Sequence, residues 1–174
     1  VMVANSMPVR DAEYFWPAND RGHAVHANRG ANGIDGNLST ALGLMHGAQS
    51  GVLLTGDLAF LHDANGLLLA KKFRGSLTVI VINNDGGGIF EHLPVAQFQP
   101  LFEEFFATPQ AVDLAQLCAA HGVRHTVVRD LPHLEQSLAA LPARGVRVLE
   151  VRAERKRDAA FRKALFAEVA ARLR

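Results

Sequence analysis

The sequence predicts an α/β protein, a three-layer αβα sandwich with a mostly parallel, Rossmann-like sheet. Two observations predict this class. Short continuous apolar runs alternate with longer segments in which apolar residues recur every three or four positions, as they do in βαβ units. The run 77–82 is also rich in β-branched residues, which is typical of a parallel strand covered on both faces. Folds of this class bind ligands beyond the carboxyl ends of their strands.

Strands are predicted where short apolar runs lie between turn residues. They are expected at residues 1–4, 24–27, 51–55, 77–82, 123–128 and 146–151. The run 77–82 is the clearest of them because it is continuous and apolar. The run 24–27 is the weakest, and it leads into a turn-rich loop at 28–33.

Helices are predicted where the apolar residues repeat with the helical period. They are expected at residues 9–16, 35–46, 62–73, 112–121, 132–141 and 155–174. The first is short because Pro8 and Pro17 bracket it. The segment 62–73 is so apolar that we expect it to be buried on most sides. Residues 89–109, which include five phenylalanines, are expected to be irregular.

Size and composition are those of an ordinary globular protein. The chain has 174 residues, 49% of them hydrophobic and 20% charged, so we expect one domain over residues 1–174. The net charge of +1 gives no indication of nucleic-acid binding, and no run reaches the roughly 20 apolar residues of a membrane span. A single cysteine, Cys118, fits a core position in a cytoplasmic protein.

Two polar turns follow two of the predicted strands at matching positions. Gly56-Asp57-Leu58 follows the strand at 51–55, and Asn84 follows the strand at 77–82 after one further asparagine. Because the carboxyl ends of parallel strands meet at one edge of a sheet, we expect Asp57 and Asn84 to lie close together. A carboxylate, an amide oxygen and a backbone carbonyl near Gly86 would supply three of the six oxygens that Mg²⁺ takes. The pattern predicts a site for Mg²⁺ and a diphosphate.

The glycines of both turns favour the same interpretation. Gly56 and the run 86–88 place no side chain between backbone and phosphate, and they permit positive φ. We expect backbone N–H groups at the following helix starts to donate to phosphate oxygens. Each turn alone is a common sequence, but both turns together, each after a buried strand, favour a site. Neither a P-loop nor a dinucleotide-binding glycine motif follows any strand.

Histidine pairs offer a weaker metal pattern. His23 with His26, and His121 with His125, have spacings that could suit zinc, but no cysteine or carboxylate completes either set at recognisable spacing. We therefore expect these histidines to lie at the surface or to cap helices.

Four segments together resemble one known family. They are Asn5-Ser6-Met7-Pro8-Val9-Arg10, the segment Asn28 to Gly36 (NRGANGIDG), the segment Gly56 to Asn65 (GDLAFLHDAN) and the segment Val81 to Phe90 (VINNDGGGIF). They are similar to the MenD family, the 2-succinyl-5-enolpyruvyl-6-hydroxy-3-cyclohexene-1-carboxylate synthases of menaquinone biosynthesis. Thiamine-diphosphate enzymes usually carry Gly-Asp-Gly where this chain has Leu58 in the third position, and that departure is typical of this branch. The resemblance covers residues 1 to about 94 closely.

The resemblance implies a cofactor site and its ligands. It implies thiamine diphosphate as cofactor, bound with Mg²⁺ or Mn²⁺ through Asp57, Asn84 and the carbonyl of Gly86. Gly56 and Leu58 lie in the same cofactor-binding motif. Ile34 matches the apolar residue that holds the cofactor in its bent shape.

The resemblance also implies substrates and the residues that receive them. The family decarboxylates 2-oxoglutarate and adds the succinyl unit to isochorismate. Arg10 and Arg29 match arginines that hold substrate carboxylates, for which the bidentate guanidinium is well suited. Ser6 matches an active-site serine near the cofactor, with helix capping as the alternative. Ile89 and Phe90 match residues that line the isochorismate site.

The resemblance further implies that part of the active site lies outside this chain. The activating glutamate of thiamine enzymes belongs to a separate pyrimidine-binding domain, normally on a neighbouring subunit of a homodimer or homotetramer. The chain opens at Val1 without a methionine, so we expect a C-terminal piece of a three-domain enzyme, inactive by itself. Another thiamine-dependent 2-oxo acid decarboxylase or acetolactate-type synthase, and a non-catalytic phosphate-binding module, stay open as alternatives. The role of Asp85 also stays open.

Overall fold

The computed structural model describes residues 1–47 and 50–173. These residues form two compact units. The first contains Val1–Asn83 and Val112–Arg152, and the second contains Asn84–Ala111 and the chain from Ala153 onward. Each unit is described by itself.

A parallel sheet forms the centre of the first unit. Its strands are β1 (Met2–Val3), β2 (Ser50–Gly56), β3 (Ser76–Asn83), β4 (Arg124–Val128) and β5 (Gly145–Arg152). Their order is β1-β2-β3-β5-β4, and every neighbouring pair is parallel. All carboxyl ends therefore point to one edge of the sheet.

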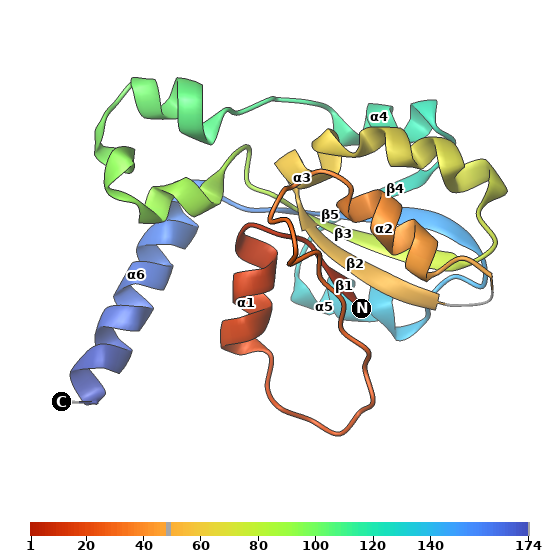
Figure 1. Cartoon of the computed structure of the whole chain (residues 1–174), viewed down its shortest axis with the longest axis horizontal. Coiled ribbons are helices and arrows are strands. Elements are labelled where there is room, and N and C mark those ends of the chain that lie inside the picture. Colours follow the sequence, from red (N-terminus) through yellow and green to blue (C-terminus); the bar gives the residue numbers. More distant parts are fainter. Residues whose placement is uncertain (48–49, 174) are drawn as a thin grey trace. The chain divides into compact units, whose positions relative to one another are not determined.

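Burial on both faces explains why the central strand is so apolar. The first six residues of β3 are buried, and Leu77, Val79 and Val81 are fully so. Figure 1 shows α2 (Asn37–Leu44) on one side of the sheet and α5 (Leu131–Ala139) on the other. The predicted class, α/β with a parallel sheet between helices, is confirmed.

This unit contains further helices, of which the first and the last agree in position with the sequence. They are α1 (Met7–Phe15), α3 (Asp57–His62), the 3₁₀ helix η1 (Ala64–Lys72) and α4 (Leu114–Ala120). Asp113 and Asp130 cap α4 and α5 by accepting hydrogen bonds from the backbone N–H groups of Gln116 and His133. Cys118 is fully buried in the core, as expected, and burial, with the charge of Glu150, raises its thiol pKa to about 11.

Two predicted elements are wrong. The expected buried helix at 62–73 is instead the end of α3 followed by η1, on which Leu68 is 67% exposed. Asp63 separates the two because its carboxylate accepts hydrogen bonds from the N–H and Oγ of Ser39 on α2. The expected strand at 24–27 is reduced to one bridge between Met2 and His26, since its residues are mostly exposed and have no second partner strand.

The second unit consists of short helices and one long one. They are the 3₁₀ helices η2 (Gly88–His92) and η3 (Pro94–Gln97), the π-helix η4 (Glu103–Ala107) and α6 (Arg155–Arg172). The segment expected to be irregular thus contains three single-turn helices, which local backbone hydrogen bonds close. The final helix is confirmed up to Arg172, and position 174 lies outside the described residues. Within the described ranges, no helix has the length and apolar character needed to cross a bilayer.

Candidate active site

The predicted site residues of the first unit follow the carboxyl ends of β1 and β2. Val3 pairs with Leu54, so the Asn5-Ser6 turn lies beside the end of β2, where α3 begins at Asp57. Asp57 directly follows β2 at the edge of the sheet, and it is 7% exposed, so it is largely shielded from water. Gly56, the last residue of β2, pairs with Ile82 near the end of β3. The ends of β2 and β3 are therefore neighbours, as the sequence predicts.

Asn5 organises the loop that carries Arg29. Its Nδ2 donates to the carbonyl of Asn28 at 2.9 Å and to that of Gly33 at 2.7 Å. Its Oδ1 accepts a hydrogen bond from Nη1 of Arg29 at 2.8 Å. Asn5 is 1% exposed, and its three partly buried hydrogen bonds hold the loop 28–33 against the end of β1.

Ser6 and Arg10 lie directly after β1. Ser6 has φ of 74°, an uncommon value for a residue with a Cβ, and such strain often occurs at functional sites. Arg10, four residues further on in α1, donates from Nη1 to the Ser6 carbonyl at 2.8 Å and so fixes the backbone at Ser6. Ser6 precedes α1 but its side chain makes no capping hydrogen bond, so helix capping does not account for it.

Ile34 is held at the start of α2 by a buried asparagine. Asn37 Nδ2 donates to the carbonyls of Ile34 at 2.9 Å and Asp35 at 3.1 Å. Ile34 itself is half-buried, and Gly36 adopts φ of 66° to complete the turn. Asn37 is fully buried, and its Oδ1 finds no hydrogen-bond donor in residues 1–47 and 50–173.

A buried carboxylate fixes the end of β3. Glu150 on β5 accepts a hydrogen bond from Asn83 Nδ2 at 2.8 Å, and it forms ion pairs with Arg152 at 3.0 Å and His125 at 2.8 Å. Burial alone would raise the pKa of Glu150, but the hydrogen bonds from Asn83 and Arg152 and the nearby cations outweigh it and lower the pKa. His125, one of the histidines first considered for zinc, therefore has a structural partner.

In the second unit, the loop 84–88 is packed against the end of η4. The Gly87 N–H donates to the carbonyl of Ala107 at 2.7 Å, and the Gly88 N–H donates to that of Gly86 at 2.9 Å. A Cβ at Gly87 would lie 2.6 Å from the Phe106 carbonyl oxygen. The glycines thus permit close backbone packing. The N–H groups of Gly87 and Gly88 are both engaged in these protein hydrogen bonds.

Asn84 is the residue of this loop that best fits a metal. Within the described part of the chain, its Oδ1 is buried and has no hydrogen-bond donor. A Cβ at Gly88 would lie 2.6 Å from Asn84 Nδ2, so a side chain there would displace the Asn84 amide. A buried oxygen without a donor is costly unless a ligand satisfies it, and an amide oxygen suits Mg²⁺.

The other predicted residues of this unit have ordinary roles in packing. Asp85 is exposed with φ of 54°, and its Oδ1 accepts a hydrogen bond from the Ala111 N–H at 3.3 Å. Phe90 packs edge-on against Phe106, with ring centroids 5.8 Å apart, and Ile89 is half-buried beside it in η2. Both residues lie in the helix that follows the loop 84–88.

The donor set fits Mg²⁺ better than a softer metal. The predicted ligands are the Asp57 carboxylate in the first unit and, in the second, the Asn84 amide oxygen and the Gly86 carbonyl, all hard oxygens. Over residues 1–47 and 50–173, no three histidine, cysteine, aspartate or glutamate side chains gather as a metal cluster. Of the predicted ligands, only Asp57 is one of these four residue types, so they would not appear as a cluster of this kind.

Sequence reasoning missed several supporting residues. Asn5, Asn37 and Glu150 are polar, buried and hydrogen-bonded to the segments that carry predicted site residues. A signal for Asn5 exists, since it directly follows an apolar strand. Glu150 lies inside a strand, where its partners on β3 and β4 come from distant sequence.

Comparisons with known proteins identify the family of this chain. Residues 7–151 match the family described as thiamine pyrophosphate enzyme, C-terminal TPP binding domain. Over 163 residues, 94% of this chain, the sequence is 59% identical to the 2-succinyl-5-enolpyruvyl-6-hydroxy-3-cyclohexene-1-carboxylate synthase of Nostoc sp. (strain PCC 7120). It is 54% identical to the synthase of Rippkaea orientalis over 99% of the chain. The chain spans 28% and 29% of the lengths of these two relatives.

Solved structures share the fold at low sequence identity. A benzoylformate decarboxylase from Polynucleobacter necessarius aligns with a TM-score of 0.72 at 18% identity, over 89% of this chain and 30% of its own. A putative thiamin diphosphate-dependent enzyme from Mycobacterium smegmatis aligns with a TM-score of 0.65 at 20% identity, over 88% and 28%. These likenesses concern the fold alone.

The chain belongs to the family of C-terminal TPP-binding domains of thiamine pyrophosphate enzymes. Its resemblance to the MenD synthases, first seen in four short segments, extends over nearly the whole chain.

Proposed function

We propose that the natural protein containing this chain is a 2-succinyl-5-enolpyruvyl-6-hydroxy-3-cyclohexene-1-carboxylate synthase. In this proposal the chain is the C-terminal diphosphate-binding domain of a three-domain enzyme, and it acts in the cytoplasm. The full enzyme decarboxylates 2-oxoglutarate and transfers the succinyl unit to isochorismate. The identity of 59% to a synthase of that name supports the proposal.

The observation that carries the proposal is the pairing of Gly56 with Ile82. It makes the ends of β2 and β3 neighbours, and Asp57 and Asn84 are the residues that follow those ends. The buried Asn84 Oδ1, which lacks a donor among the described residues, supports a role as ligand. Asp57, Asn84 and the Gly86 carbonyl would hold Mg²⁺ or Mn²⁺, and the metal would offset the negative charge of the diphosphate.

The chain's own residues would position substrate beside the cofactor. Bound thiamine diphosphate supplies a nucleophilic carbon that also accepts the electron pair released by decarboxylation. Arg10 and Arg29 would bind carboxylates of 2-oxoglutarate and isochorismate, since each guanidinium keeps donors beyond its one recorded protein hydrogen bond. The strained Ser6, whose side chain makes no capping bond, would present its hydroxyl to the reacting group.

Apolar residues would shape the site. Ile34, with its carbonyl fixed by Asn37, would support the bent cofactor, while Gly56 and Leu58 would flank the metal-bound diphosphate. Ile89 and Phe90 would line the isochorismate pocket and exclude water from it.

The activating acid would come from outside this chain. We propose a pyrimidine-binding domain of the same protein, contributed by a neighbouring subunit of a homodimer or homotetramer. The chain alone is then expected to have no synthase activity. Turnover of 2-oxoglutarate with isochorismate by the purified 174-residue chain would contradict this part of the proposal.

Two measurements on the natural protein test the function. Calorimetry should show Mg²⁺-dependent binding of thiamine diphosphate and no comparable binding of ATP or NAD, which separates a thiamine enzyme from a general phosphate-binding module. Product analysis should then show succinyl transfer to isochorismate rather than decarboxylation of pyruvate. Efficient pyruvate turnover without succinyl transfer would favour a decarboxylase or acetolactate-type synthase.

A further inference from the structure

We propose that Arg155 is a positioning residue that sets the loop presenting Asn84 and Gly86 to the metal. The inference rests on the proposed function and adds a residue from the far end of the chain to that site. All the contacts that support it lie within the second unit.

Arg155 contacts two helices that adjoin the loop 84–88. They are η2, which follows the loop in sequence, and η4, against which the loop packs. Its Nε forms an ion pair with Glu91 of η2 at 3.1 Å, and its Nη2 donates to Glu103 of η4 at 2.6 Å. The Arg155 side chain is only 10% exposed, as is that of Glu91. Two carboxylates from separate helices therefore meet one buried guanidinium, whose planar fork fixes the direction of both contacts.

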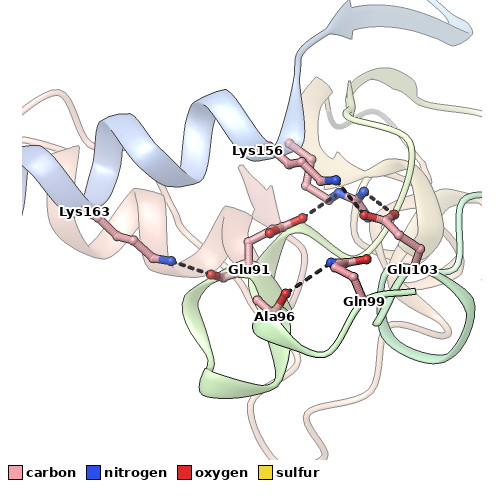
Figure 2. Close-up of polar contacts among 7 residues, drawn as sticks. Glu91, Ala96, Gln99, Glu103, Lys156 and Lys163 are labelled. Atoms are coloured by element: carbon pink, nitrogen blue, oxygen red, sulfur yellow. Dashed lines mark hydrogen bonds and ion pairs between the residues drawn. The ribbon is translucent and has the colours of Figure 1, made fainter. Parts of the chain in front are cut away.

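Neighbouring contacts make this arrangement specific. Lys156 forms an ion pair with Glu103 at 2.9 Å, and Lys163 Nζ donates to the Glu91 carbonyl at 2.7 Å. Figure 2 shows Lys156 directed at Glu103 and Lys163 at the Glu91 backbone. The hydrogen bond from Arg155, followed by that from Lys156, lowers the pKa of Glu103, so its carboxylate stays charged near neutral pH.

The loop depends on the two elements that Arg155 joins. Gly87 donates to Ala107 at the end of η4, and a Cβ at Gly86 would overlap the Ala107 carbonyl oxygen. Arg155 itself approaches the loop, since its Nη1 would lie 3.2 Å from the same Cβ at Gly86. In the described residues this buried Nη1 has no hydrogen-bond acceptor. A displacement of η4 would therefore move Gly86, and with it the carbonyl that is proposed to hold the metal.

Aromatic packing adds a second link from Arg155 to η4. Its guanidinium carbon lies 6.0 Å from the centre of the Phe102 ring, which stacks on Phe106 with a centroid distance of 6.1 Å. Phe102 is fully buried. Lysine could keep the charge but would lose both the fork and the flat contact.

The test uses Arg155→Lys and Arg155→Met in the natural protein, with Arg157→Met as control. Arg157 is an exposed neighbour on the same helix, so it reports loss of charge without loss of the buried contacts. Calorimetry gives the affinities for Mg²⁺ and thiamine diphosphate, and steady-state assays give the apparent KM for Mg²⁺ and for 2-oxoglutarate. Thermal unfolding is measured with and without cofactor.

Positioning predicts that both Arg155 variants weaken Mg²⁺-dependent cofactor binding by about 10-fold or more, as loss of a supporting residue does at other metal sites. The apparent KM for Mg²⁺ should rise while that for 2-oxoglutarate stays unchanged. Loss of a positive charge alone would instead strengthen cation binding, so the direction of the change in Arg155→Met separates positioning from electrostatics. Arg157→Met should behave as wild type.

Unchanged cofactor affinity in Arg155→Lys, with or without a lower Tm, would overturn the inference and leave a structural role. If neither Arg155 variant folds, Glu103→Gln removes the ion pairs with Arg155 and Lys156 and keeps the guanidinium, and it should still raise the apparent KM for Mg²⁺. An unchanged value there would also overturn the inference. Failure of the wild-type protein to bind thiamine diphosphate would refute the proposed function instead.

Discussion

The two units achieve order by different physical means. In the first, hydrogen-bonded strands and a mainly apolar core hold the residues at the sheet edge, and Leu53, Leu77 and Val148 are completely buried. In the second, the loop 84–88 is held by glycine contacts and by ion pairs around Arg155. The comparison teaches that one proposed metal ligand, Asp57, rests on hydrophobic burial, and the other, Asn84, lies in a loop that depends on charge and close backbone packing.

The largest expected effect is that of a side chain at Gly86. Gly86→Ala should lower the free energy of unfolding by about 4 kcal/mol or more, because its Cβ would overlap the Ala107 carbonyl and φ is +132°. Binding of thiamine diphosphate should be lost as well. Gly122→Ala is the control, since φ is also positive at +68° but no atom lies within 4 Å of the added Cβ. It should cost only about 1–2 kcal/mol. Equal effects in urea unfolding would contradict the packing account.

The next effect concerns the buried asparagine of the first unit. Asn5→Ala removes the hydrogen bonds to Asn28, Gly33 and Arg29 and should lower the free energy of unfolding by about 2–4 kcal/mol. Asn19→Ala, in an exposed loop with local bonds only, should change it by less than about 0.5 kcal/mol. A stable Asn5→Ala protein with wild-type kinetics would show that the loop 28–33 is held by other contacts.

Arg29 should matter for the substrate more than for stability. It is exposed and makes one recorded hydrogen bond, so Arg29→Ala should leave the Tm within a few degrees of wild type. Loss of a charged hydrogen bond to a substrate carboxylate should reduce kcat/KM by about 10- to 100-fold in the natural protein. Arg21→Ala, another exposed arginine, serves as the control. Unchanged kinetics in Arg29→Ala would remove this residue from the proposed site.

The smallest expected effect is a change in pH dependence. The pKa of Glu150 is lowered on folding, so its stabilising contribution is present above the ordinary glutamate pKa of 4.5 and is lost as the pH falls through the folded-state pKa. Glu150→Gln should therefore flatten the loss of stability below about pH 4.5. Glu154→Gln, at an exposed position, should keep the wild-type slope. The free energy of unfolding is measured from pH 3 to 7. A steeper loss of stability toward low pH in Glu150→Gln than in the wild type would contradict this account.

The contrast between apolar packing and polar contacts explains which elements could be predicted from the sequence. The strands 51–55 and 77–82 were predictable within one or two residues, because strands buried on one face or on both carry short apolar runs. The helix at 62–73 was not, because a single carboxylate, Asp63, pairs with a residue 24 positions away and ends α3. Local propensity carries no information about such a partner.

The candidate site divides in the same way. Asp57 and Asn84 were predictable because each follows an apolar strand, and the pairing of those strands is confirmed. The supports were not predictable, since Glu150 and Arg155 act on segments 67 and 52 residues away. The close packing of Gly87 against η4 was not predictable for a related reason, since it depends on Phe106 and Ala107, about 20 residues further along the chain.

The most direct test of the account asks whether one metal needs ligands from both units. Electron paramagnetic resonance of the natural protein with thiamine diphosphate and Mn²⁺ counts the bound metal. We predict one bound Mn²⁺ per subunit in the wild type, lost to a similar extent in Asp57→Ala and in Asn84→Ala. Wild-type Mn²⁺ binding in either variant would contradict the claim that these two strand ends build a single metal site.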